Sequence, residues 1–282
     1  MSFVERQINL QFSDGNTTLS LEGLRCTALI TNLGGYNSAG QLQLRVYGMS
    51  LDQMNQYSST GTDQAAVLNR EVLISAGDVG SNLIQVFSGT IFRSFIDFSG
   101  LPDVSFCVAA CAGYYNKATA SSANHYPGAQ NAEDIIAALS AKAGFEFVNN
   151  GAHAVLQNQY CYGSIVDQIQ SVAKAAIIPM AIENNKVYIW PNDGTRDDTI
   201  ISISPDNGMI GYPAYWEAGF IVKCEFNPQI ANGRTIALTS SIPKSNVTVP
   251  VQMVTHELST LTPNGAWFTT SKLSPSNYVP VN

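Results

Sequence analysis

The side chains that could do chemistry in this chain are three histidines, five cysteines and two pairs of adjacent carboxylates. A nucleophilic site of the Ser-His-Asp kind needs a histidine beside a serine and a carboxylate, and it is recognised by geometry rather than by chain position. His125 falls in a polar loop, His153 stands close to Gly151, and His256 lies within an alternating strand pattern. The sequence leaves such a site open, but no feature of it points to one.

A metal site would have to be built around Cys107 and Cys111, which lie four residues apart on an expected strand and so face the same way. Structural zinc takes about four ligands of this kind. His125 and Cys161 are the remaining candidates, and their spacing does not suit a site. We therefore expect ordinary buried thiols and no metal.

The cysteine count also bears on the redox state of the protein. Residues 1–11 have no secretion signal, and the number of cysteines is odd and their spacing irregular. This pattern predicts reduced thiols in a protein made in a cytoplasm. The five are Cys26, Cys107, Cys111, Cys161 and Cys224.

Paired carboxylates could cleave a glycosidic bond if two of them faced each other across a groove. Glu133 and Asp134 are better explained as the acidic first turn of a helix, and Asp197 and Asp198 as part of a turn. The sequence also lacks the nucleotide-binding, nucleophile-elbow and metalloprotease motifs. We predict no catalytic, cofactor-binding or metal residue and no cofactor, with a peptidoglycan hydrolase kept as an alternative.

Clustered aromatic residues could stack on sugars or bases. They are Tyr114 with Tyr115, Tyr160 with Tyr162, and Tyr212 with Tyr215 and Trp216. No basic cluster accompanies them, so we expect them to pack at domain or subunit contacts. A receptor-binding or sugar-binding protein is the second alternative.

Composition narrows the class further. Charged residues make up 12% of the 282 residues, against about 25% in a typical soluble domain, and hydrophobic residues make up 45%. The formal charge is -7, and the 14 Lys and Arg are scattered, which argues against nucleic-acid binding. No apolar run approaches the roughly 20 residues of a membrane span. These numbers favour a folded protein that makes large contacts.

The elements that would position these residues are mostly strands. In residues 41–47, Leu42, Leu44 and Val46 alternate with polar residues, which is typical of a sheet with one packed face. The same pattern recurs before residue 100 and again after residue 196. Between them, apolar spacing predicts a helix from Asn131 to Gly144, a second from Ser164 to Pro179, and a hairpin over residues 180–190.

The expected fold is mainly β with an α/β insert, with two antiparallel β-barrels and a small helix-helix-hairpin module. Residues 1–100 form the first barrel and residues 101–130 begin the second. Residues 131–195 form the α/β module, and residues 196–282 complete the second barrel.

Several stretches resemble a known family. ISISPDNGMIG (201–211) and VQMVTHELSTLTPNGAWFT (251–269) are similar to the closing segments of phage tail proteins. VYGMSLDQMNQYS (46–58), VLISAGD (72–78) and VFSGTIFRSFID (86–97) look like the barrel of the same group. Together they resemble the baseplate or tail-tip hub proteins of phages, whose relatives are the spike proteins of type VI secretion.

The resemblance implies a structural virion protein, assembled in the host cytoplasm, that is not an enzyme. In this family two tube-like barrels per chain and three chains form a ring that adapts a sixfold tail tube to a threefold spike and lets DNA pass without specific binding. The implied partners are further copies of the chain in a homotrimer, a tail tube or distal tail protein, the spike, other baseplate proteins and the tape measure protein. No lysozyme-like domain and no β-helix needle is present in the sequence, so we expect wall digestion and puncturing to belong to partners.

Overall fold

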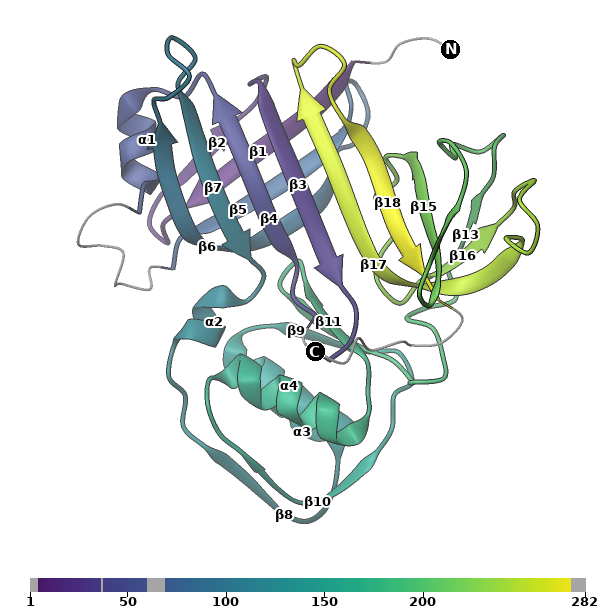
Figure 1. The fold of residues 1–282 in the computed structure, drawn as a ribbon. Helices are drawn as coiled ribbons and strands as arrows, with labels where there is room; N and C mark the ends of the chain where they lie inside the picture. The colour runs from purple at the N-terminus through teal and green to yellow at the C-terminus, as the bar shows by residue number, and fades with distance from the viewer. Residues whose placement is uncertain (1–4, 37, 60–68, 275–282) are drawn as a thin grey trace.

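The computed structural model describes residues 5–36, 38–59 and 69–274. Parts of the predicted β regions, namely residues 1–4, 60–68 and 275–282, lie outside the described residues. The chain is mainly β with few helices, as the alternating pattern predicts. Most of its strands lie in two regions, and an α/β module lies below them (Figure 1).

The first β region is an antiparallel sheet with the strand order β3-β4-β7-β6-β5-β1-β2. A short helix, α1 (Leu51–Tyr57), packs beside β6. The strands are β1 (Arg6–Ser13), β2 (Thr18–Leu21), β3 (Cys26–Leu33), β4 (Gln41–Tyr47), β5 (Glu71–Asp78), β6 (Ile84–Asp97) and β7 (Ser105–Cys111).

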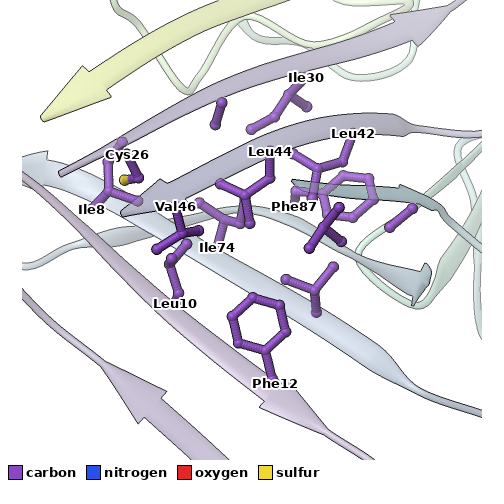
Figure 2. Packing of buried hydrophobic residues seen from close by; sticks show 14 of the residues in the cluster. Ile8, Leu10, Phe12, Cys26, Ile30, Leu42, Leu44, Val46, Ile74 and Phe87 are labelled. Atoms are coloured by element: carbon purple, nitrogen blue, oxygen red, sulfur yellow. The ribbon is translucent and has the colours of Figure 1, made fainter. Parts of the chain in front are cut away.

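The sheet curls, so that β1 and β5 lie behind β3 and β4 (Figure 1). The predicted alternation is confirmed, because Leu42, Leu44 and Val46 are buried while their neighbours on β4 face outward. These three side chains belong to the same buried cluster as Leu10 and Phe12 of β1, and Figure 2 shows Val46 close to Leu10 and Leu42 close to Phe87. Burying five such side chains contributes roughly 1.5–3 kcal/mol each, so this core is a main source of stability.

β7 corrects the expected domain boundary. We expected residues 101–130 to begin the second β region, but β7 lies between β4 and β6 and buries Phe106 and Val108 in the first core. A short connection joins β6 to β7, and consecutive strands with short connections usually pair. Alternation identifies a strand but not its neighbours, which is why the sequence misplaced it.

The α/β module follows. The helices predicted from apolar spacing are present as α3 and α4, and the predicted hairpin is β11–β12, with Asn184 and Asn185 at positive φ in its turn. Ser164 caps α4 through a capping box with Asp167. Strand β9 pairs in parallel with β12, and β8 pairs with β10 as a separate two-stranded ribbon. The elements are α2 (Tyr114–Ala118), β8 (Asn124–Asn131), α3 (Ala132–Ala143), β9 (Glu146–Asn149), β10 (Val155–Cys161), α4 (Ile165–Ala176), β11 (Met180–Glu183) and β12 (Lys186–Ile189).

The second β region is formed by the last third of the chain, and its core gathers side chains such as Val222, Ile236 and Val254. Its long strand β17 pairs with β16 at its start, and further along it lies between β18 and β3 of the first region. The elements are β13 (Ile200–Ile203), β14 (Ala214–Trp216), β15 (Gly219–Glu225), β16 (Thr235–Leu238), β17 (Val247–Thr260) and β18 (Trp267–Leu273).

The pairing of β17 with β3 joins both regions into one 13-stranded sheet. The main path of this sheet ends at β2 on one side and at β14 on the other. Among the described strands, therefore, the pairing does not close either region into a barrel.

Candidate functional site

The most extensive functional surface is one face of the shared sheet. It crosses β15, β18, β17, β3, β4, β7 and β6, which lie side by side across Figure 1. Because side chains alternate along each strand, the outward residues of neighbouring strands fall into rows. One row runs through Glu225, Phe268, Glu257, Leu29, Gln43, Ala109 and Arg93. We call this surface the shared face.

The shared face is hollowed where the two regions meet. A shallow hollow of about 860 Å³ is lined by residues of β3, β4, β6, β7 and β17. Its charged residues are Arg45, Arg93 and Glu257, and its floor includes Leu29 and Phe95. It therefore contains a single carboxylate and cannot supply the acid pair of a glycosidase.

Two cations of the shared face, Arg45 and Lys223, have a carboxylate partner, whereas Arg93 forms no ion pair among the described residues. Arg45 lies 3.4 Å from Asp97, and Lys223 lies 3.7 Å from Glu257. Hydrogen bonds from Ser99, and to a lesser degree the charge of Arg45, lower the pKa of Asp97. Exposed pairs of this kind add little to stability, but they leave the face close to neutral.

A β-bulge in β6 shapes one side of the shared face. The register shifts between Ile91 and Arg93, so Phe92 and Arg93 are both exposed. Bulges re-aim side chains in this way. Phe92 packs against Tyr114 with ring centroids 5.2 Å apart, and the Arg93 guanidinium lies 5.1 Å from the centroid of the Phe95 ring.

The first pair of acidic candidates, Glu133 and Asp134, lies at the start of helix α3. Glu133 lies in the first turn of α3, pairs with exposed His153 and accepts a bond from the Ala154 amide. Partial burial opposes its ionisation, but these hydrogen bonds outweigh it and lower its pKa. A general acid needs a raised pKa, so the shift is opposite to what the acid of a glycosidase requires.

In the second acidic pair, Asp197 is bound by Arg234 and Thr199. Burial disfavours the charged form of Asp197, but hydrogen bonds from Arg234 and Thr199 outweigh it and lower the pKa of Asp197. The Arg234 Nε lies 2.8 Å from the Asp197 Oδ2. Asp198 is exposed.

The histidines and cysteines do not converge. His256 is buried on β17, where its Nδ1 lies 2.9 Å from the Thr269 Oγ1, and His125 lies on the β8–β10 ribbon. Cys107 and Cys111 share the outward side of β7, as predicted, whereas Cys161 belongs to the module core. All five thiols are free, and the described residues contain no cluster of three or more potential metal ligands.

The aromatic clusters differ in exposure, since Tyr114, Tyr115 and Trp216 are half-buried while the other tyrosines of these clusters are exposed. Tyr160 and Tyr162 stack with ring centroids 6.1 Å apart, and His125 lies beside Tyr160 on the ribbon. Tyr212 and Tyr215 are 70% and 63% exposed near β14. Exposed aromatic side chains without neighbouring charge are typical of contact surfaces.

A buried junction that sequence reasoning missed holds the three parts together. Arg196 donates to Glu183 of the module at 2.6 Å and to the carbonyl of Asn232 in the second β region. Asn232 in turn donates to the carbonyl of Leu33, which ends β3. The Arg196 guanidinium also lies 3.7 Å from the centroid of the Tyr188 ring. The sequence gives no sign of this junction, because Arg196 lies in a polar, turn-like stretch and its burial depends on distant parts of the chain.

Solved structures define the class of this fold. It is similar to the tail protein of Neisseria meningitidis MC58, with a TM-score of 0.63, 6% identity and coverage of 94% of this chain and 96% of that chain. It is similar to the 43 kDa tail protein of prophage MuSo2 from Shewanella oneidensis, with a TM-score of 0.61, 8% identity and coverage of 95% and 98%. The E. coli c3393 protein, a component of the type VI secretion system, has a TM-score of 0.61, 12% identity and coverage of 96% and 77%. The fold is therefore that of phage tail and type VI spike-related proteins.

The family follows from the sequence itself. The chain belongs to the baseplate hub gp41 family, whose sequence model matches residues 2–260. No individual curated protein matches it by sequence. Its role is structural rather than enzymatic, and it is a component of the phage tail. In the described part of the chain, no helix has both the length and the apolarity to cross a membrane.

Proposed function

We propose that this protein is a homotrimeric hub that adapts the sixfold tail tube to the threefold spike. Each chain contributes two β regions, so three chains present six similar β regions to the sixfold tube. The observation that carries this proposal is the shared face, because one continuous sheet surface crosses both regions through the pairing of β17 with β3. Such a surface suits the wall of a channel.

In the assembly, the two β regions of each chain form two tube-like barrels. Residues 1–100 together with β7 supply the first, and residues 196–282 supply the second. The module at residues 131–195 lies on one side of both. Edge strands left open in one chain favour this assignment, because a ring of copies satisfies edges that a monomer leaves unpaired.

DNA passes through the channel without specific binding. Each free cation that meets a phosphate retards sliding and adds salt-dependent affinity. The pairs Arg45–Asp97 and Lys223–Glu257 neutralise two cations of the shared face, and the net charge of the chain is -7. An almost neutral wall in an acidic protein fits a conduit better than a nucleic-acid clamp.

The other partners follow from the position of a hub. They are the tail tube or distal tail protein on one side, the spike on the other, further baseplate proteins around the ring, and the tape measure protein in the channel. The exposed ribbon with Tyr160 and Tyr162 suits a contact with another baseplate protein, since the aromatic side chains of contact surfaces are often exposed in the free subunit. Assembly takes place in the host cytoplasm.

Electron microscopy tests the function. Antibodies against the purified chain should label intact phage at the tail tip, and rotationally averaged images of the isolated oligomer should show a threefold ring with an open centre. Label along the whole tube, or on the head, would contradict a hub. A compact particle without a channel would contradict the conduit while leaving a tail-tip location in place.

A further inference from the structure

We propose that Asn150, in the turn between β9 and β10 of the module, is a site of spontaneous deamidation. The chain contains four Asn-Gly pairs, which begin at Asn150, Asn207, Asn232 and Asn264. Asparagine is a thermolabile residue, and a following glycine favours its reaction because no side chain hinders the next main-chain nitrogen. The fold restrains the four pairs to different degrees, and it restrains Asn150 the least.

The reaction needs only the chain itself and water. The main-chain nitrogen of Gly151 loses its proton and attacks the Cγ of Asn150, so that an N–Cγ bond forms and the Cγ–Nδ2 bond breaks. The side-chain amide leaves as ammonia, and a cyclic succinimide remains. Water then opens the succinimide at either carbonyl and yields aspartate or isoaspartate, with no change of oxidation state. The reaction therefore requires a side chain that can turn toward the next residue and a main-chain nitrogen that is not held elsewhere.

Both reacting groups are free at Asn150. Among the described residues, the Asn150 side chain has no hydrogen-bond partner, and the main-chain amide of exposed Gly151 donates no hydrogen bond. The chain is held on either side of this pair. The main-chain amide of Asn150 donates to the carbonyl of Ile189 at 2.9 Å, and the Asn149 side chain bonds both main-chain groups of Ala152. The turn thus keeps the two reacting groups close together without engaging either of them.

Asn232 is the most tightly held of the four. It is 1% exposed, and its side-chain amide donates to the carbonyl of Leu33 at 3.0 Å. The main-chain amide of Gly233 donates to the carbonyl of Val251 at 2.9 Å. Attack would break both bonds at a buried position, where each broken bond costs the full desolvation of its group. We therefore expect Asn232 to be protected in the folded chain.

Asn264 and Asn207 each lack one of the two free groups. At Asn264 the nitrogen is held, because the main-chain amide of Gly265 donates to the carbonyl of Thr262 at 3.0 Å. At Asn207 the side chain is held, because its amide donates to the carbonyl of Ser202 at 2.7 Å. Both residues are exposed, so water alone does not distinguish them from Asn150. The difference lies in the hydrogen bonds that must break before the ring can close.

The products disturb the module. Isoaspartate carries the main chain through its side-chain carbon, which lengthens the turn between Asn149 and Ala152 and adds a carboxylate. Ala152 is 2% exposed in the module core, and the bonds from Asn149 hold it there. A longer turn cannot keep these bonds together with the bond from Asn150 to Ile189. Deamidation at Asn150 therefore loosens this edge of the module as the protein ages.

Peptide mapping by mass spectrometry tests the site in the full-length wild-type chain. The folded protein is incubated at mildly alkaline pH and sampled over several weeks, and each sample is digested with trypsin. The four pairs fall in four different tryptic peptides, namely 143–174, 197–223, 224–234 and 245–272. We expect Asn150 to be converted about tenfold faster than Asn232 and Asn264, because only at Asn150 are both reacting groups free to take up the attack geometry.

Two controls sharpen the test. The same chain unfolded in guanidinium chloride has lost the restraints of the fold, so all four pairs should react there at similar rates. Asn150→Gln removes the Asn-Gly pair and should abolish the modification at this position, while the rates at the other three pairs stay unchanged. Circular dichroism spectra taken before and after incubation should confirm that the chain remained folded.

The outcomes are distinct. Conversion of folded Asn150 that is no faster than that of Asn232 or Asn264 overturns the proposal, and so does conversion that is fastest at Asn207. A folded chain in which no pair reacts while all four react after unfolding overturns it as well. Preferential conversion at Asn150 in the folded chain, with similar rates after unfolding, supports it. The hub role is tested separately, by tail-tip labelling and the ring images.

Discussion

Acidification should weaken the fold through His256, which lies on β17 where the two β regions meet. The side chain is 4% exposed, with Thr269 beside its Nδ1 and the Phe226 ring edge-on to it. A small cavity beside it is also lined by Arg196, Arg234 and Glu183. Burial lowers the pKa of His256 from 6.5 to about 4. The folded state therefore favours the neutral form of the His256 imidazole.

The sign and size of the effect follow from proton linkage. Between these two pKa values the unfolded chain binds more protons than the folded chain, so stability is greatest above the unfolded pKa and falls as pH drops through this window. From about pH 8 to about pH 5, protonation of this one group lowers the free energy of unfolding by about 2 kcal/mol. At still lower pH the total loss reaches about 3 kcal/mol. Carboxylates with lowered pKa values, such as Asp97 and Asp197, remain ionised in this range and contribute little.

Urea unfolding at several pH values measures this loss. His256→Gln keeps a hydrogen-bonding group near Thr269 but cannot titrate, so its free energy of unfolding should depend on pH by about 2 kcal/mol less than that of the wild type over the same range. His125→Gln is the matched control, because His125 is exposed and its replacement should leave the pH dependence unchanged. Equal losses in the wild type and His256→Gln would refute the reasoning, as would a gain in stability on acidification.

Three further predictions concern stability. Arg196→Met leaves the Glu183 carboxylate buried without its partner and should lower the free energy of unfolding by about 3–5 kcal/mol in urea, and adding Glu183→Gln should recover part of the loss. Gly233→Ala places a methyl group 2.7 Å from the Trp190 ring at a φ of +81°, and a cost of about 1–3 kcal/mol should appear as a lower Tm in calorimetry. Ser164→Ala removes the capping box of α4 and should cost about 1 kcal/mol in urea unfolding followed by circular dichroism, whereas Ser164→Asp should retain most of the stability.

Local structure could be predicted where one segment carries its own signal. The apolar spacing and end residues of residues 131–144 and 164–179 mark α3 and α4, and Asn184-Asn185 marks the β11–β12 turn. Strand alternation in residues 41–47 likewise identifies both the strand and its buried side. These features depend on contacts between residues close together in the chain, so they can be predicted from the local sequence.

Pairing between distant strands could not be predicted. The alternation of residues 104–111 is the same whether β7 joins the first region or the second, and the parallel pairing of β9 with β12 leaves no pattern of its own. The buried pair of Arg196 and Glu183 was missed for a similar reason, since its partners come from separate parts of the fold. The position of Glu133 and Asp134 in the first turn of a helix could be predicted, because the apolar spacing that follows them marks that helix.

The shared face shows why a search for motifs could identify the family but not the functional surface. Leu29 and Glu257 are 228 positions apart in the chain and become neighbours only because β3 pairs with β17. A one-residue slip in that pairing would turn every outward side chain of β17 inward, exposing the core residues Val254 and Leu258. Burial of that core therefore fixes the register, and the register fixes which charges lie together on the face. The surface that we propose as a channel wall is thus a consequence of core packing, and its near-neutral charge is set by pairs such as Lys223–Glu257 that form across strands.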